Sequence, residues 1–216
     1  MSASDMATIV ISTVALIISI VTWLNSIKPA NITLSVGDQM EIYHDNCQAL
    51  YIHLPVVFQN TGAQAGVVRS LGLILRDPET KEAILIKWMG FLKPEERSGG
   101  NWIWESNATP LTISGASEVS KMAEFYGAGN VAGWLPKPIE YEFYLLAWTS
   151  ESQTPSRRFV FKWRFDEETV SAVRLNLERN RSSAVTNSKW ISLSGYAPNA
   201  MMLSERLFNE LVRSSK

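Results

Sequence analysis

The stretch Arg158-Phe159-Val160-Phe161-Lys162-Trp163-Arg164-Phe165 places an aromatic residue at every second position. Between the aromatic residues lie Arg158, Lys162 and Arg164, together with Val160. A period of two residues with one apolar and one basic face is typical of a half-buried antiparallel strand. Residues 140–149 are also rich in apolar and aromatic residues, and the polar segment 150–156 separates the two stretches. The pattern predicts a β-hairpin within a mainly β domain.

The same period of two residues recurs toward the N-terminus. Apolar residues alternate from Leu50 to Phe58 and end at the turn signal Asn60-Thr61-Gly62. A second turn, Asp77-Pro78-Glu79-Thr80, predicts a hairpin over residues 71–88, because proline presets the backbone dihedral of the turn. Weaker strands are predicted at 31–36, 101–104, 111–113 and 119–125. About seven to nine short antiparallel strands suit a two-sheet β-sandwich.

Two stretches carry a resemblance at the level of the fold. Residues Val56 to Val68 resemble the succession of apolar run, Asn-x-Gly and apolar run in bacterial immunoglobulin-like adhesion and accessory domains. Residues Thr109 to Ile113, followed by Gly115, Ser117 and Phe125, look like the later strands of such domains. The resemblance covers about residues 31–166. It implies an immunoglobulin-like β-sandwich over 30–166 and no catalytic residues, and a function borrowed from it is analogy alone.

The N-terminal part of the chain has the properties of a membrane anchor. Residues Ala7 to Leu24 form an apolar run without a charged residue, and Lys28-Pro29 ends it. A helix from Met6 to Ile27 spans roughly 33 Å, close to the hydrocarbon thickness of about 30 Å. We therefore expect a short flank at 1–5 and a single transmembrane helix at 6–28, in the inner or plasma membrane. The alternatives are a cleaved signal peptide, although 1–5 contain no Lys or Arg, and a buried soluble helix.

The flanking charges do not decide which side of the membrane carries the rest of the chain, because Lys28 is the single basic residue near either end of the helix. Within the helix, small and hydroxylated residues recur at alternating intervals of four and three. These are Thr8, Ser12, Ala15, Ser19 and Thr22. Such a repeat predicts a helix-packing seam, since small residues allow close approach between helices in lipid. The alternative is that the hydroxyls bond to their own backbone. The seam predicts a parallel homo-oligomer.

Residues 167–216 are predicted to form a largely helical tail. Asp166-Glu167-Glu168 are suited to the N-terminus of a helix that buries Val170, Val173 and Leu177. A terminal amphipathic helix is predicted at 199–214, with Asn199 as its N-cap. This helix either docks on the β-domain, binds a protein partner or lies on a membrane surface.

No pattern in the sequence predicts catalysis, a metal site or a cofactor. Ser114-Gly115 and Ser194-Gly195 lack the Gly-x-Ser-x-Gly elbow of hydrolases. His44-Asp45-x-Cys47 combines a thiol and a base, but such close neighbours rarely face each other. Two histidines and one cysteine do not make a conventional zinc site. The formal net charge of −1 gives no basis for nucleic-acid binding.

Three tryptophans are candidate contact residues. Trp102 and Trp104 follow a glycine pair and share one strand face, where they either form a buried pair or stack on a ligand. Trp134 ends the apolar loop 127–136, which is a candidate protein contact.

The sequence as a whole predicts a non-enzymatic interaction, scaffold or sensor subunit at the membrane, acting as a homo-oligomer or within a larger complex. The lipid bilayer is the expected surrounding of its helix, and protein partners would bind the 127–136 loop or the 199–214 helix. One alternative is a carbohydrate- or envelope-binding module that uses exposed tryptophans. Another is an oligomerising membrane effector of a toxin or defence type.

Overall fold

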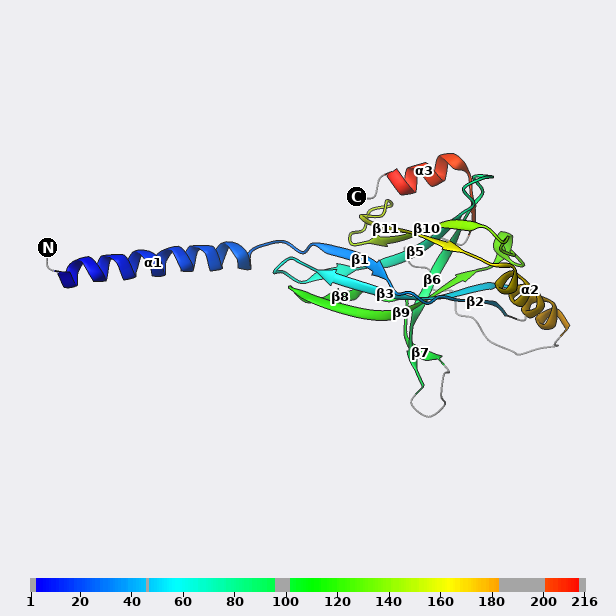
Figure 1. Ribbon diagram of the computed structural model, residues 1–216, viewed down its shortest axis with the longest axis horizontal. Helices are drawn as coiled ribbons and strands as arrows, with labels where there is room; N and C mark the ends of the chain where they lie inside the picture. The colour runs from blue at the N-terminus through cyan, green and yellow to red at the C-terminus, as the bar shows by residue number, and fades with distance from the viewer. Residues whose placement is uncertain (1–2, 46, 96–101, 183–200, 214–216) are drawn as a thin grey trace.

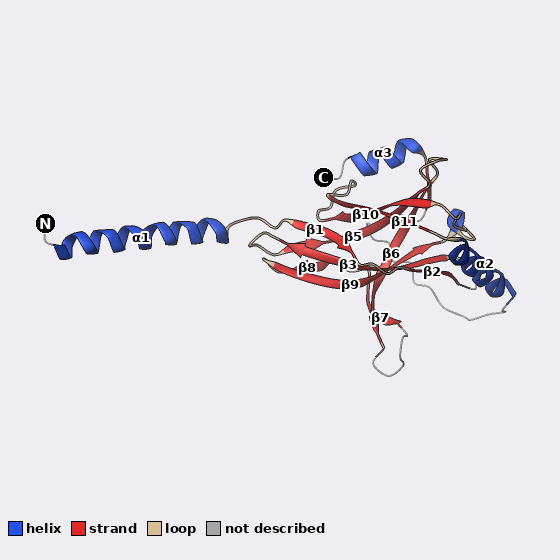
Figure 2. Ribbon diagram, in the orientation of Figure 1, coloured by secondary structure: helices blue, strands red, loops and turns tan. Residues whose placement is uncertain are grey.

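The computed structural model describes residues 3–45, 47–95, 102–182 and 201–213. A long helix, α1 (Ala3–Ser26), stands apart from a mainly β domain with antiparallel strands (Figures 1 and 2). The predicted apolar helix and the mainly β class are confirmed. Residues 4–26 of α1 are long and apolar enough to cross a membrane, a property that signal sequences near an N-terminus share.

Most strands belong to one ten-stranded sheet, whose main path runs β1-β3-β9-β6-β5-β10-β11. β2, β7 and β12 pair with members of this path, and β4 and β8 form a small second sheet. The strands are β1 (Ile32–Val36), β2 (Glu41–His44), β3 (Leu50–Asn60), β4 (Gly66–Val68), β5 (Ser70–Arg76), β6 (Ala83–Pro94), β7 (Trp102–Asn107), β8 (Leu111–Ile113), β9 (Ser117–Gly127), β10 (Glu140–Trp148), β11 (Arg157–Arg164) and β12 (Met201–Leu203). The remaining elements are the short 3₁₀ turn η1 (Gly129–Val131), α2 (Glu167–Ser182) and α3 (Glu205–Arg213).

The two ends of the main path come together. The Arg157 side chain of β11 donates from Nε to the carbonyl oxygen of Ile32 in β1 at 2.7 Å. The sheet is therefore nearly closed and barrel-like, and the two-sheet immunoglobulin-like arrangement is not confirmed. Alternation along a strand is the same in a sandwich and in a barrel, so the pattern did not distinguish them.

Both predicted hairpins are confirmed. β5 pairs with β6 across the Asp77 turn, from Gly72 opposite Lys87 to Arg76 opposite Ala83. β10 pairs with β11 from Glu140 opposite Arg164 to Ala147 opposite Arg157. The weaker strands at 31–36, 111–113 and 119–125 also form, and the strand predicted at 101–104 corresponds to β7. β2 was not predicted, because its four residues are too short to show a period.

The barrel carries apolar side chains on its outside as well as its inside. Inside lie large side chains such as Phe58, Trp88, Phe125 and Phe143. A second cluster on the outer face of β5, β6 and β10 contains Ile74, Leu85, Tyr144 and Trp148, and the C-terminal residues Leu203, Phe208 and Val212 cover it. The C-terminal helix therefore docks on the β-domain.

The tail differs in part from the prediction. α2 begins as expected, with the Asp166 carboxylate accepting a hydrogen bond from the Thr169 N–H at 2.7 Å, and Val170, Val173 and Leu177 are buried. The helix predicted at 199–214 is wrong in its first part, and Asn199 lies outside the described residues. Residues 201–203 form β12, which pairs with Ala83–Leu85 of β6, and α3 begins after Ser204. At residues 83–85, one edge of β6 pairs with β5, and β9 does not extend along the other edge. Hydrogen bonding of residues 201–203 to this other edge outweighs their local helical pattern.

Asn60 and the residues after it fix the junction between α1 and the barrel. The Asn60 side chain accepts hydrogen bonds from the N–H groups of Asn31 and Gly62, both at 3.0 Å. The carbonyl oxygen of Lys28 accepts hydrogen bonds from the N–H groups of Ala63 and Gln64, both at 3.1 Å. Gly62 passes so close to Pro29 that a Cβ atom at Gly62 would lie 1.9 Å from the Pro29 oxygen. The β-domain is therefore held directly at the end of the helix.

Candidate functional site

The end of β6 and β7 form an arm that projects from the barrel across the direction of α1 (Figure 1). Three consecutive large side chains on this arm are exposed: Trp102 by 38%, Ile103 by 39% and Trp104 by 46%. Among the described residues outside α1, the other exposed large apolar side chains are Ile27, which directly follows α1, and Val160 and Leu175, which lie singly. Of the two alternatives for the tryptophan pair, the structure therefore shows the exposed one. Trp102 and Trp104 share one face of β7, and Ile103 lies on the other face. Exposed apolar side chains grouped in this way commonly mark a contact site.

Gly90 of β6 holds Trp104 in place. A Cβ atom at Gly90 would lie 2.5 Å from the Trp104 ring and 2.2 Å from the carbonyl oxygen of Ser106. Only glycine therefore lets the indole lie against the strand. A β-bulge between Phe91 and Leu92 shifts the register, so that Leu92 pairs with Trp104. Trp102, two residues away, shares the same face of the arm.

The registers place a cluster of ionisable side chains on the same outer face. Leu92 pairs with both Trp104 and Met122, and Glu124, two residues along β9, pairs with His53 of β3. The His53 ring lies between two carboxylates, with Nδ1 2.9 Å from Glu41 and Nε2 2.9 Å from Glu124. We call Glu41, His53 and Glu124 the His53 cluster.

Two members of the His53 cluster are buried, since His53 is 6% and Glu124 5% exposed, whereas the Glu41 side chain is 58% exposed. Burial lowers the pKa of His53, but hydrogen bonds and charge from Glu124 and Glu41 outweigh it and raise the pKa above the ordinary 6.5. Both ring nitrogens face carboxylates, which only accept hydrogen bonds when ionised, so the geometry favours the imidazolium. With both nitrogens occupied, His53 is neither a free base nor a metal ligand. The cluster ties β2, β3 and β9 together.

A row of tyrosines lies beside the His53 cluster. Tyr43 pairs with Tyr51, which pairs with Tyr126 on the next strand. The rings of Tyr43 and Tyr51 stack at 5.1 Å, and the Tyr43 hydroxyl lies 3.3 Å from His53 Nε2. Burial, with the nearby carboxylates, raises the pKa of Tyr43. These hydroxyls therefore stay protonated and serve as neutral polar groups.

The sequence did not predict the His53 cluster. Glu41 and Glu124 are 12 and 71 residues from His53, and only the strand order β2-β3-β9 brings them together. The one available signal was that the positions alternating with the apolar residues of β3 include the polar residues Tyr51, His53 and Gln59, which indicates an outer face but not its partners.

The remaining sequence candidates lie elsewhere. Trp134 is half-buried, and its ring packs edge-on against Tyr141 of β10 at 5.7 Å. Its carbonyl oxygen lies 2.9 Å from Nε2 of the buried His44. The loop that contains it is thus part of the packing at the end of the barrel. Trp134 packs against the core of the barrel, whereas Trp102 and Trp104 are exposed on the arm.

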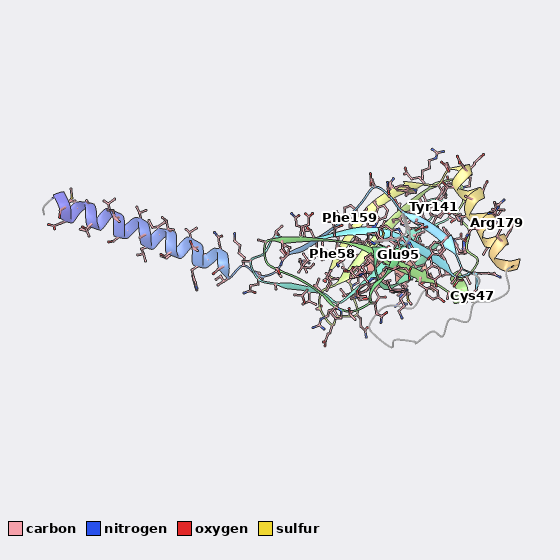
Figure 3. The ribbon with its side chains drawn as sticks, turned by 90° about the horizontal axis from the view of Figure 1, so that it is seen from below. Cys47, Phe58, Glu95, Tyr141, Phe159 and Arg179 are labelled. Atoms are coloured by element: carbon pink, nitrogen blue, oxygen red, sulfur yellow. The ribbon has the colours of Figure 1, made fainter. Side chains whose placement is uncertain are left out.

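His44, Asp45 and Cys47 do not form a nucleophile and base. The Asp45 carboxylate accepts hydrogen bonds from the backbone N–H groups of Cys47 and Ala49, both at 2.9 Å, and so shapes the turn. Cys47 is exposed at the end of the domain farthest from α1 (Figure 3). Within the described ranges, no group of three or more His, Cys, Asp and Glu side chains is arranged to hold a metal ion.

A small pocket near the β5–β6 turn contains the buried Asp77 and the side chains of Lys137 and Tyr141. Burial raises the pKa of Asp77, but hydrogen bonds from the Thr80 N–H, the Lys137 ammonium and the Glu79 N–H outweigh it and lower the pKa to about 2. Lys137 lies 3.0 Å from Asp77. Because the carboxylate is already satisfied by the turn and by Lys137, we assign it a structural role.

All five residues of the predicted seam lie in α1, on one face within about 80° of arc at 3.6 residues per turn. The hydroxyls of Thr8 and Ser19 donate to the carbonyl oxygens of Ser4 and Ala15 in their own helix, at 2.9 and 2.8 Å. Self-association through the seam stays a prediction.

No family model and no curated protein matches the chain. Similar solved structures include a protein from Bordetella pertussis described as ApaA, 16% identical over 64% of this chain and 90% of that one, with a TM-score of 0.28. A β-glucosidase from Listeria innocua is 11% identical, with 63% and 16% covered and a TM-score of 0.29. A β-glucosidase from Kluyveromyces marxianus is 10% identical, with 64% and 14% covered and a TM-score of 0.30. The chain thus spans a small part of each glucosidase. TM-scores of 0.28 to 0.30 do not support a shared function.

Proposed function

We propose that the protein is a non-enzymatic interaction subunit, anchored in the inner or plasma membrane by α1, which recognises a partner through the arm. The observation that carries this proposal is the run of three exposed apolar side chains, Trp102, Ile103 and Trp104. Exposing large apolar side chains to water costs about 25 cal/mol per Å², a cost that a partner removes. The likeness of residues 56–68 to immunoglobulin-like adhesion domains is in keeping with this role, by analogy.

The short connection between α1 and the barrel supports the role. Hydrogen bonds from Ala63 and Gln64 to Lys28 hold the domain at the end of the helix. A domain confined to the bilayer surface meets membrane partners at a raised effective concentration, so weak contacts suffice. The anchor itself is tested by finding full-length protein, with its N-terminal residues retained, in carbonate-washed membranes.

If a partner occupies the arm, the side chain of residue 103 is shielded in native membranes. We would replace Cys47 by serine and introduce Ile103→Cys, with Val160→Cys as a matched control of similar exposure on β11. We expect N-ethylmaleimide to label Ile103→Cys about tenfold more slowly in native membranes than in dilute detergent, the factor for about 90% occupancy. Val160→Cys should label equally in both. Equal rates for Ile103→Cys would contradict the proposed function.

A second candidate function, carbohydrate binding, is favoured by one observation. The Trp104 ring lies against Gly90 and is 46% exposed, which suits stacking on a sugar ring. Binding to a glycan array by the intact protein, lost in Trp104→Ala and kept in Val160→Ala, would support it. Binding that survived Trp102→Ala combined with Trp104→Ala would remove this candidate.

A further inference from the structure

The arm presents an open strand edge as well as exposed side chains. β7 pairs with β6 on one side, and within the described residues no strand pairs with its other side. An open edge is a row of backbone donors and acceptors ready to pair with another strand. Residues 102–104 carry none of the charges or prolines that usually protect such edges.

The apolar part of this edge reads the same in both directions, Trp-Ile-Trp. When a strand pairs antiparallel with its own copy about Ile103, each Trp102 lies opposite Trp104 of the other copy, and Ile103 lies opposite itself. Paired residues then share a face, as antiparallel pairing requires. Aromatic cross-strand pairs of this kind stabilise the pairing of two strands.

The direction of the arm matches the symmetry that a membrane imposes. Two copies with the same sidedness are related by a two-fold axis along the bilayer normal. Such an axis reverses every direction that lies in the membrane plane. The arm runs across the direction of α1 (Figure 1), so β7 and its copy meet antiparallel when α1 spans the bilayer.

We infer that β7 is a self-association edge, where Trp102, Ile103 and Trp104 pair antiparallel with the same residues of a second copy. The inference rests on the proposed function and names the partner at its arm. A stable dimer in solution usually buries about 1,200 Å² or more, and three residue pairs bury far less. Confinement in a membrane supplies the missing stability by raising the effective concentration. The pairing should therefore exist in membranes and dissociate in dilute detergent.

Oxidative crosslinking in membranes tests the inference in the full-length Cys47→Ser protein. Residues directly opposite in an antiparallel pair have Cβ atoms about 5 Å apart, close to disulfide geometry. We expect Ile103→Cys to form at least about tenfold more disulfide dimer than the Val160→Cys control. In a mixture of Trp102→Cys and Trp104→Cys, each variant should crosslink with the other more than with itself.

The outcomes separate this inference from the function on which it rests. Ile103→Cys that is shielded from N-ethylmaleimide but forms no more dimer than Val160→Cys would overturn self-pairing and assign the arm to another occupant. Crosslinking of Trp102→Cys mainly with itself would overturn the register. Loss of shielding and of crosslinking together would overturn both proposals. Unchanged thermal unfolding of each variant in detergent confirms that the barrel is intact.

Discussion

Replacing Asn60 by alanine is expected to destabilise the β-domain by about 3 kcal/mol, because a buried side chain that joins several backbone groups is lost. Asn60 is 1% exposed. Its Oδ1 accepts hydrogen bonds from the N–H groups of Asn31 and Gly62, both at 3.0 Å. Its Nδ2 donates to the carbonyl oxygens of Gln64 at 2.8 Å and Ser114 at 3.0 Å. The Ser114 oxygen keeps a hydrogen bond from the Ser117 hydroxyl at 2.7 Å, and the other three backbone groups lose this partner at about 1 kcal/mol each.

Denaturant unfolding of the full-length protein in detergent measures this loss. The matched control is Gln59→Ala, since the neighbouring Gln59 side chain is exposed, and its expected effect is within about 0.5 kcal/mol. Asn60→Asp should cost at least as much as Asn60→Ala, because a carboxylate has no N–H to donate to carbonyl oxygens. A loss below about 1 kcal/mol for Asn60→Ala would show that the network does not stabilise the junction.

Replacing His53 by phenylalanine is expected to destabilise the protein by about 3 kcal/mol near neutral pH, because Glu124 is left buried without its imidazolium. The same contact makes stability depend on pH. The pKa of His53 is raised in the folded protein, so its contribution is complete below 6.5, the ordinary value, and is lost as the pH rises through the folded-state pKa. We therefore expect the free energy of unfolding of the native chain to fall as the pH rises above about 6.5.

The pH dependence distinguishes this contact from simple packing. In His53→Phe, the fall in stability over that range should be reduced. Glu124→Gln should also reduce it, whereas Glu118→Gln, at an exposed position of the same strand, should leave it unchanged. A native chain whose stability rose with pH over this range would contradict a stabilising His53 imidazolium.

The candidate site could be predicted only in part. Trp102 and Trp104 were recognisable because they stand two residues apart beside a glycine pair, a local feature. Their exposure depends on Gly90, which pairs with Asn107 across the arm, and on the extension of β6 beyond β5. The His53 cluster depends on Glu124, which reaches His53 only through the β3–β9 pairing. Residues this far apart in the chain show no common pattern in the sequence.

The sequence by itself determined the apolar helix α1, the mainly β class, both hairpins and the start of α2. Each of these rests on short-range rules: an apolar run, a period of two residues, a proline turn or a helix cap. The tertiary structure alone decided that the sheet nearly closes through Arg157, that residues 201–203 form a strand on β6, and that the arm carries its tryptophans in the open. The physical reason is that these features depend on which distant strand edges and faces pair with each other. A local pattern shows which face of the sheet a residue occupies, but not which distant residue lies beside it.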